Sequence, residues 1–257
     1  MTGEGEAISF LETTKLGKNF GGLWAVRDLD LRVAQGERRA IIGPNGAGKT
    51  TLFHLLSGHL APSSGEIRLG GRAITHLPAH QRARAGLARS FQITNLLPEM
   101  TVLEMCVMAI YGRRANPLAL VRPLLGYQAE RVRAEQLLDT WGLWERRHMP
   151  IQALSYGDQR LLEIVVALAQ EPQLMLLDEP TAGLSQVESR QVVETIKRLP
   201  HVTLLLIEHD MQVVFEVVDS ITVMHQGQEV ATGAPEAIRA SEAVQQVYMG
   251  ELTEGTE

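Results

Sequence analysis

The sequence has a single cysteine and no long apolar run. These shortages bear on disulfide bonds and on membrane-spanning helices. Its single cysteine, Cys106, cannot form an internal disulfide, which fits a reducing compartment. Cys106 lies in an apolar stretch, which favours a buried core thiol over a catalytic one. The apolar runs, such as 202–207, have the length of a strand, whereas a helix that crosses a bilayer needs roughly 18 apolar residues or more.

Positive charge is also scarce. Lys and Arg number 24 and Asp and Glu number 30, which gives a net charge of −6, whereas a nucleic-acid partner favours a basic face. Residues 1–6 carry acidic side chains where a secretory signal would carry basic ones. We therefore expect a cytoplasmic protein without a nucleic-acid partner, which reaches a membrane only through another protein.

The most informative stretch that is present is a glycine-rich loop. It consists of Gly43, Pro44, Asn45, Gly46, Ala47, Gly48, Lys49 and Thr50, followed by Thr51. This spacing matches G-x-x-x-x-G-K-[ST], in which backbone N–H groups and a helix N-terminus approach phosphate oxygens. Lys49 adds a positive charge for the outer phosphates, and the Thr50 hydroxyl can bind Mg²⁺. The loop predicts that the chain binds a nucleoside triphosphate.

Around this loop the chain alternates between strand and helix signals. Antiparallel hairpins are expected within 8–33 and 65–72, and the antiparallel part is expected to end there. Buried strands are expected at 39–42, 174–177, 203–207 and 221–224, and helices at 51–56, 100–109, 128–138, 160–169 and 187–199. Such alternation predicts an α/β nucleotide-binding core with a parallel sheet, interrupted by a helical segment. The stretch 112–126 is expected to be a loop with short helical turns.

Acidic residues follow one of the buried strands. Asp178 and Glu179 come directly after 174–177, and the carboxyl ends of parallel strands border the ligand crevice. Asp178 is expected to bind Mg²⁺ together with Thr50, and Glu179 to act as general base or to position the attacking water. His209, after the next strand, is expected to reach the outermost phosphate or the water. The alternatives are solvated strand ends and a structural histidine.

A second anion site is predicted where Leu154 to Arg160 opens a helix. Ser155 is a suitable N-cap, Asp158 follows at the spacing of a capping box, and Gly157 permits a close backbone approach. The alternative is simply a well-capped helix. A phosphate loop cannot face this site within one compact domain without an additional fold constraint, whereas two copies arranged head to tail could bring the two together.

Two other features are read as ordinary surface. His76 and His80 have a spacing seen in zinc sites, but Pro78 between them disfavours a helix, so a solvated loop is expected. The arginines within 82–89 alternate with alanines and a leucine, which favours a solvated face. Gln92, taken alone, would be a surface glutamine.

Together these motifs resemble the ATPase subunit of an ABC transporter. The resemblance implies a P-loop NTPase core with a mixed sheet, an N-terminal antiparallel β-subdomain and an inserted helical subdomain. A single ATPase domain would span 7–250, with a core from 8–92 and 171–235, a helical signature subdomain from 93–170, and a C-terminal helix and tail from 236–257. Two ATP molecules would be held in a head-to-tail dimer, either a homodimer or a pair with a close paralogue.

The resemblance also assigns roles to particular residues. Each ATP would lie between one subunit's phosphate loop and the partner's signature segment, formed by Ser155, Tyr156, Gly157 and Asp158. Phe20 would stack on adenine, with Trp24 the less favoured candidate. Gln92 would bind Mg²⁺ and the attacking water. The implied partners are integral-membrane permease subunits and, indirectly, a solute-binding protein, with the chain peripheral on the inner face of the cell membrane.

Within the family, the sequence is most similar to ATPases of branched-chain amino acid importers. The similar segments are 20–23, 88–92, 206–211, 247–251 and the tyrosine variant of the signature. Ser185 stands where the family usually has aspartate, Val166 replaces a frequent arginine, and 113–126 matches no familiar pattern. The implied function is ATP hydrolysis that powers import of a small solute. The alternatives are a lipid or lipopolysaccharide exporter ATPase and a non-transport ATP-gated clamp on nucleic acid or ribosomes.

Overall fold

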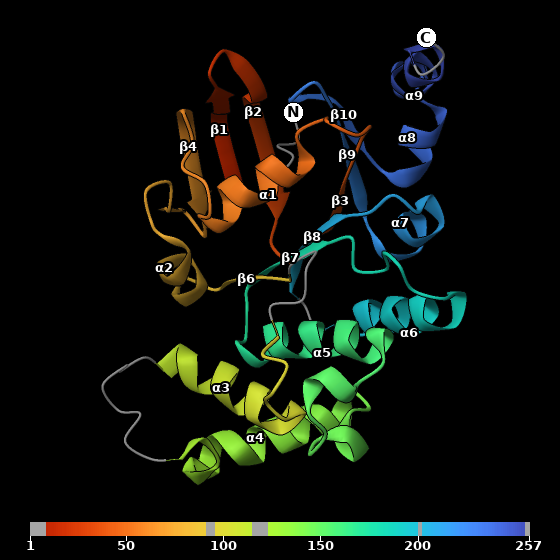
Figure 1. Ribbon diagram of the computed structural model, residues 1–257. Helices are drawn as coiled ribbons and strands as arrows, with labels where there is room; N and C mark the ends of the chain where they lie inside the picture. Colours follow the sequence, from red (N-terminus) through yellow and green to blue (C-terminus); the bar gives the residue numbers. More distant parts are fainter. Residues whose placement is uncertain (1–8, 91–95, 115–122, 200–201, 255–257) are drawn as a thin grey trace, which may run out of the picture. The chain divides into compact units, whose positions relative to one another are not determined.

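The structure is a computed structural model that describes residues 9–90, 96–114, 123–199 and 202–254. The chain forms two compact units: a first unit from 1–85 and 201–257, and a second unit from 86–200. Figure 1 labels their helices and strands. The division into a core and a helical subdomain, with the boundaries expected above, stays a prediction.

An antiparallel sheet forms from the N-terminal part of the first unit (Figure 1). Its order is β2-β1-β4-β5, from strands β1 (Ser9–Phe20), β2 (Leu23–Ala34), β4 (Ser64–Leu69) and β5 (Arg72–Ala73). Both expected hairpins are confirmed, as the antiparallel pairs β1–β2 and β4–β5. Gly21 and Gly22 form the turn of the first hairpin, with φ of 59° and 106°. Buried and exposed side chains alternate along β2, because successive residues of a strand point to opposite faces.

The first unit also contains the strand that leads into the phosphate loop. Strands β3 (Arg38–Ile42), β8 (Thr203–Ile207) and β9 (Ser220–His225) run parallel, with β3 between the other two. The expectation that antiparallel pairing ends near Arg72 is wrong, because β10 (Gln228–Gly233) pairs antiparallel with β9. Gln226 and Gly227 have φ of 47° and 78°, and positive φ at both central residues permits a tight two-residue turn.

The helices of the first unit are short apart from one near the C-terminus. They are α1 (Lys49–Ser57), α2 (Ala79–Arg84), α7 (Met211–Val217), α8 (Pro235–Ala240) and α9 (Glu242–Glu254). The helix expected to follow the phosphate loop is confirmed as α1. It ends at Gly58, whose φ of 79° lets its N–H bond back to the last turn.

Arg82 contradicts the expectation that the arginines of 82–89 form a solvated face. Its side chain is 1% exposed, and its guanidinium donates to four backbone carbonyls: those of Leu55, Leu56, Thr75 and Leu77. Two of these belong to the last turn of α1, where carbonyls lack helical partners. Burial lowers the pKa of Arg82 to about 10, and the group stays charged at neutral pH. The alternating pattern did not reveal this helix cap.

The second unit combines a strand pair with a helical core. Strands β6 (Leu87–Arg89) and β7 (Leu174–Asp178) run parallel. The helices are α3 (Val102–Arg114), α4 (Gln128–Thr140), α5 (Tyr156–Ala169) and α6 (Gln186–Lys197), with 3₁₀ turns at Leu124–Gly126, Trp144–Arg146 and Ile151–Ala153. All four expected helices are confirmed. Of 112–126, residues 115–122 lie outside the described ranges.

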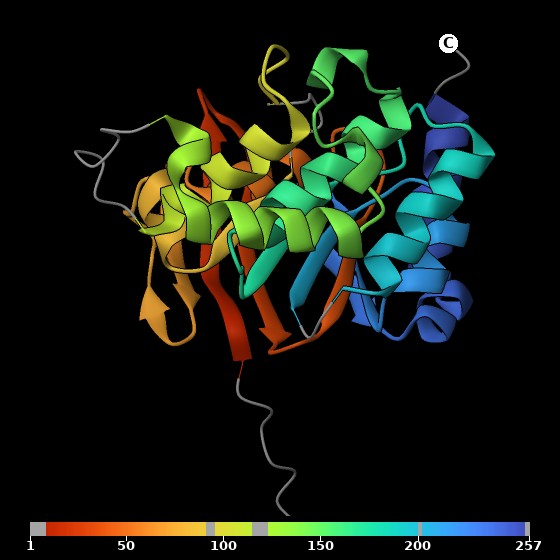
Figure 2. The same ribbon diagram turned by 90° about the horizontal axis from the view of Figure 1, so that it is seen from below.

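Helices α3, α4 and α5 lie side by side around one apolar cluster (Figures 1 and 2). Cys106 of α3 lies within it and is fully buried, as expected for a core thiol. Burial raises the pKa of its thiol to about 12, so the reactive thiolate is scarce at neutral pH. Across the described residues, no helix is long and apolar enough to cross a membrane.

Glu37 gives the first unit a pH-dependent contribution to stability. Its carboxylate accepts hydrogen bonds from the Ala34 N–H, the Arg39 guanidinium and the Ser220 hydroxyl. Burial alone would raise the pKa of Glu37, but these partners outweigh burial and hold the pKa below 4.5. The stabilisation is therefore present above the unfolded-state pKa and is lost as pH falls through the lowered folded-state pKa.

We predict that Glu37→Gln lowers the free energy of unfolding by about 2 kcal/mol at neutral pH, because charged hydrogen bonds are lost. The difference from wild type should shrink as pH falls below 4.5, the ordinary carboxyl value. Urea unfolding across a pH series measures this. Glu66→Gln, which breaks an exposed pair with Arg68, is the matched control and should change little. A Glu37→Gln difference that does not vary with pH would contradict the assignment.

Candidate nucleotide-binding site

The phosphate loop joins the end of β3 at Ile42 to the start of α1 at Lys49. Gly43, Gly46 and Gly48 have φ of 147°, 80° and 97°, values that L side chains rarely adopt. A Cβ at Gly43 would lie 2.0 Å from the Met224 carbonyl oxygen, and one at Gly48 would lie 2.2 Å from the Ala25 carbonyl oxygen. These close backbone approaches require glycine at both positions.

Lys49 is the only cation within this loop, and its side chain folds back over it. Its Nζ donates to the carbonyl oxygens of Gly43, at 2.5 Å, and Pro44, at 2.9 Å. The residue is 6% exposed. Gly48 caps α1 without a side-chain acceptor, so the first-turn N–H groups are suited to an anion. Thr50 is exposed and Thr51 is partly buried in the same turn.

Another predicted residue, His209, belongs to the same unit. His209 follows β8, which pairs parallel with β3 so that Ile207 lies opposite Ile41. Gly43 and His209 each come two residues after these paired positions, so they lie at the same edge of the sheet. His209 is exposed, and its backbone N–H donates to the Glu208 carboxylate at 2.9 Å.

The aromatic residues near the first hairpin turn are both accessible. Phe20 is 48% exposed and Trp24 is 40% exposed. The Lys18 Nζ lies 5.2 Å from the centre of the Phe20 ring. Either ring can therefore stack on a flat ligand, and the preference for Phe20 stays a prediction.

The acidic pair ends β7 in the second unit. Asp178 is 1% exposed, and its Oδ2 lies 2.9 Å from Nη2 of Arg89. The expectation that Arg89 belongs to a solvated face is therefore wrong, as it is for Arg82. Glu179 is partly buried and has φ of 48°. Such a left-handed conformation is strained for a residue other than glycine and often marks a functional position.

The predicted signature segment opens helix α5. Ser155 caps the helix and accepts from the Asp158 N–H at 3.1 Å, as expected. The Asp158 carboxylate instead pairs with Arg146 at 3.0 Å, so it does not act as the expected capping-box partner. Tyr156 is 43% exposed, and its hydroxyl accepts from Arg160 at 2.6 Å.

Gly157 lies against Glu188 of α6, which was not among the predicted site residues. A Cβ at Gly157 would lie 2.7 Å from Oε1 of Glu188. Hydrogen bonds from Ser185 lower the pKa of Glu188, and the Gly157 N–H adds a smaller contribution in the same direction. Ser185 and Glu188 form a capping box at the start of α6. The S-x-x-E pattern at 185–188 was the available signal.

Two predicted Mg²⁺ ligands, Thr50 in the first unit and Asp178 in the second, each carry an oxygen donor. The Thr50 hydroxyl and the Asp178 carboxylate are hard oxygen donors, the kind that Mg²⁺ prefers. In the described ranges, no group of three or more His, Cys, Asp and Glu side chains could hold a metal ion. Mg²⁺ commonly relies on one or two carboxylates together with substrate phosphates. Gln92, the remaining predicted ligand, lies outside the described residues.

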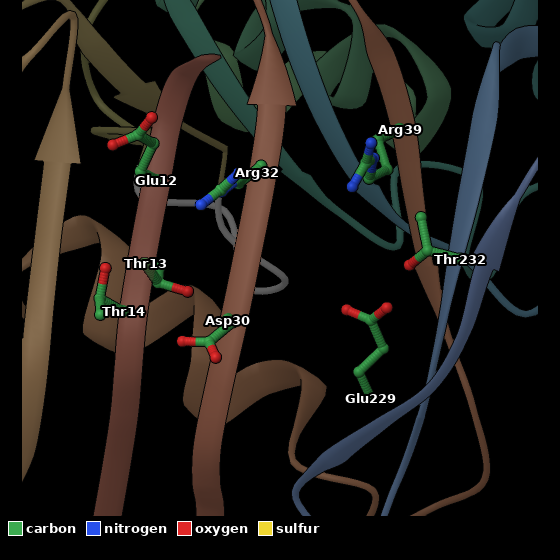
Figure 3. A pocket seen from close by; sticks show the side chains of 8 residues that line it. All are labelled: Glu12, Thr13, Thr14, Asp30, Arg32, Arg39, Glu229 and Thr232. Atoms are coloured by element: carbon green, nitrogen blue, oxygen red, sulfur yellow. The ribbon is translucent and has the colours of Figure 1, made fainter. Parts of the chain in front are cut away.

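A separate hollow of about 410 Å³ lies in the first unit (Figure 3). It is lined by Glu12, Thr13, Thr14, Asp30, Arg32, Arg39, Glu229 and Thr232. Several of these already have partners: Asp30 pairs with Lys15 and Arg39 with Glu37. None of the eight residues belongs to the phosphate loop, so this hollow is distinct from the predicted nucleotide site.

We predict different outcomes for alanine at two glycines of the loop. Gly48→Ala should lower nucleotide affinity by more than about tenfold, because its Cβ would meet the Ala25 carbonyl and displace the loop. Gly46→Ala has open space around its Cβ and should cost only the conformational strain of roughly 1–2 kcal/mol. Fluorescent-nucleotide titration measures both. Equal affinities for the two variants would contradict the loop geometry.

Comparison with known proteins identifies the family of the chain. Residues 26–182 match the model of the ABC transporter family. The high-affinity branched-chain amino acid transport ATP-binding protein LivG of Salmonella typhimurium is 41% identical over 242 residues, covering 90% of this chain and 94% of LivG. BraF of Pseudomonas aeruginosa, with the same description, is 39% identical over 249 residues, covering 94% and 98%.

Solved structures show the same fold. A nucleotide-free ATP-binding cassette from an ABC transporter superposes with a TM-score of 0.83 at 27% identity, covering 94% of this chain and 99% of the other. The ADP conformation of the cassette MJ1267 gives 0.82 at 27% identity, covering 95% and 99%. The phosphate loop, the strand-end carboxylates and these relatives lead to one conclusion: the chain belongs to the ABC transporter family as an ATP-binding cassette, an enzyme that hydrolyses ATP.

Proposed function

We propose that this protein hydrolyses ATP to power the import of branched-chain or related amino acids. The observation that carries the proposal is the match to LivG and BraF, which are named as branched-chain amino acid transport ATP-binding proteins, along nearly the whole of each chain. The phosphate loop supplies the chemistry, since Lys49 and the glycine backbone are arranged for a triphosphate.

The proposed mechanism assigns a task to each predicted residue. The N–H groups of the loop and Lys49 hold the β- and γ-phosphates, and Phe20 stacks on the base. Thr50, Asp178 and Gln92 are the proposed Mg²⁺ partners, and bound Mg²⁺ neutralises charge on the phosphate oxygens. Glu179 polarises the attacking water, while His209 and Gln92 orient the water and the γ-phosphate. Catalysis is then mostly positioning and charge neutralisation.

Lys49 exchanges partners in this mechanism. The Lys49 ammonium donates to the Gly43 and Pro44 carbonyl oxygens. Phosphate oxygens carry negative charge and form stronger hydrogen bonds to an ammonium than neutral carbonyls do. We therefore propose that the Lys49 ammonium binds the phosphate oxygens of ATP in preference to the loop carbonyls.

The proposed site is completed by a second ATPase subunit, either a copy of this chain or a close paralogue. Ser155, Tyr156, Gly157 and Asp158 of that subunit contact the γ-phosphate through the N-terminus of α5, where helix N–H groups favour an anion. Permease subunits hold the dimer at the inner face of the membrane, and an external solute-binding protein delivers the amino acid. Ser185 replaces the usual aspartate of the family and caps α6 instead.

Glu179→Gln tests the assignment of the water-polarising residue. We predict that ATP binding stays within about threefold of wild type, because the phosphate contacts lie elsewhere. Hydrolysis should fall by about a hundredfold or more, because the amide cannot accept a proton. Equilibrium nucleotide binding and phosphate release measure the two effects. Near-normal turnover in the variant would remove Glu179 from the mechanism.

Mixing two inactive variants tests the head-to-tail dimer. Lys49→Ala damages the phosphate loop and Ser155→Arg the signature segment, so each variant alone should hydrolyse ATP poorly. A mixture should regain activity, because one of the two sites in a mixed dimer combines an intact loop with an intact signature segment. Steady-state ATPase assays at several mixing ratios measure the recovery. No recovery from two well-folded variants would contradict a shared site.

A further inference from the structure

Arg89 lies at the end of β6, directly beside the strand that delivers Asp178. It pairs with Leu176 in the parallel register of β6 and β7. The following residue, Ser90, is bound to the same place on β7, because its N–H donates to the Leu176 carbonyl at 2.9 Å. The backbone at Arg89 is therefore fixed against β7, which also fixes the position from which its side chain extends.

The Arg89 guanidinium and the Asp178 carboxylate form a buried ion pair. Nη2 of Arg89 lies 2.9 Å from Oδ2 of Asp178, and the side chains are 4% and 1% exposed. Removing two charges from water is costly, so such a pair contributes little net stability compared with apolar residues of similar size. A buried pair at the end of β7 is thus better explained by what Asp178 does than by stability.

The same carboxylate is the proposed partner of Mg²⁺, so two cations depend on it. A guanidinium in contact with Asp178 repels a divalent cation bound through that carboxylate, and burial strengthens the repulsion because the local dielectric is low. The guanidinium also orients the Asp178 carboxylate through this contact. Both effects follow from the 2.9 Å contact between Nη2 of Arg89 and Oδ2 of Asp178.

We propose that Arg89 is a positioning residue that shares Asp178 with Mg²⁺ and thereby sets the Mg²⁺ concentration that nucleotide binding requires. It holds the carboxylate ready before the metal–nucleotide complex arrives, and it limits how tightly the metal is then retained. Weaker retention of Mg²⁺ favours release of ADP after hydrolysis. The inference rests on the proposed role of Asp178 as a Mg²⁺ partner.

The test is a Mg²⁺ titration of fluorescent-ADP binding to the full chain, starting in EDTA. Arg89→Gln removes the charge but keeps a hydrogen-bond donor, and the Mg²⁺ midpoint should fall by about tenfold. Arg89→Lys keeps the charge and should stay within about threefold of wild type. Arg84→Gln, which removes an exposed positive charge from α2, is the matched control and should leave the midpoint unchanged. An unchanged or raised midpoint in Arg89→Gln would overturn the proposal.

A double variant keeps the proposal testable if Arg89→Gln does not fold. Asp178→Asn alone leaves a buried, charged arginine near the metal, whereas Asp178→Asn with Arg89→Gln replaces the ion pair by two amides. The double variant should therefore need less Mg²⁺ than Asp178→Asn. Equal midpoints would show that the pair is only structural.

The same titration separates the proposal from the function on which it rests. If Asp178→Asn has the wild-type Mg²⁺ midpoint, the metal role of Asp178 fails. If Asp178→Asn raises the midpoint while the removal of Arg89 has no effect, the metal role stands and only the role of Arg89 fails.

Discussion

The close backbone contacts of the phosphate loop are the constraint on which the first unit depends. Gly43 lies against the Met224 carbonyl of β9, and Gly48 against the Ala25 carbonyl of β2. The loop thus packs between β9 and β2. A side chain at either glycine would push the loop away from the neighbouring strand. This rigidity fixes the N–H groups at the start of α1, which is what a preorganised phosphate site needs.

In the second unit, buried ion pairs rather than backbone contacts fix the side chains near the proposed site. Arg89 and Asp178 form an ion pair at the end of β7, and Arg160 and Glu163 form another on α5, the helix that the signature segment opens. Charges in a low-dielectric interior are costly unless paired. The two buried pairs lie beside the proposed catalytic and signature residues. We infer that they hold these side chains in place, at a cost in the free energy of folding.

Local pattern predicted most of the elements. The expected strands and helices formed where apolar periodicity and capping residues agreed, as at Ser155, because these signals depend on neighbours within a few residues. The hairpin at Gln226 and Gly227 was missed, although positive φ there permits a tight turn. The turn was missed because it contains Gln-Gly, which is a weaker turn signal than Asn-Gly. Gln226 nevertheless adopts the left-handed conformation that the turn requires.

By itself, the sequence determined the local motifs, namely a phosphate loop, two carboxylates at the end of a strand and a capped helix, because each is defined by contiguous residues. The partners of the charged side chains were decided only by the tertiary structure. Arg82 and Arg89 lie in one short run of similar composition, yet Arg82 caps α1 and Arg89 pairs with Asp178, 89 residues further along. The reason is physical: the environment of a charge is set by long-range packing, which spacing along the chain does not encode.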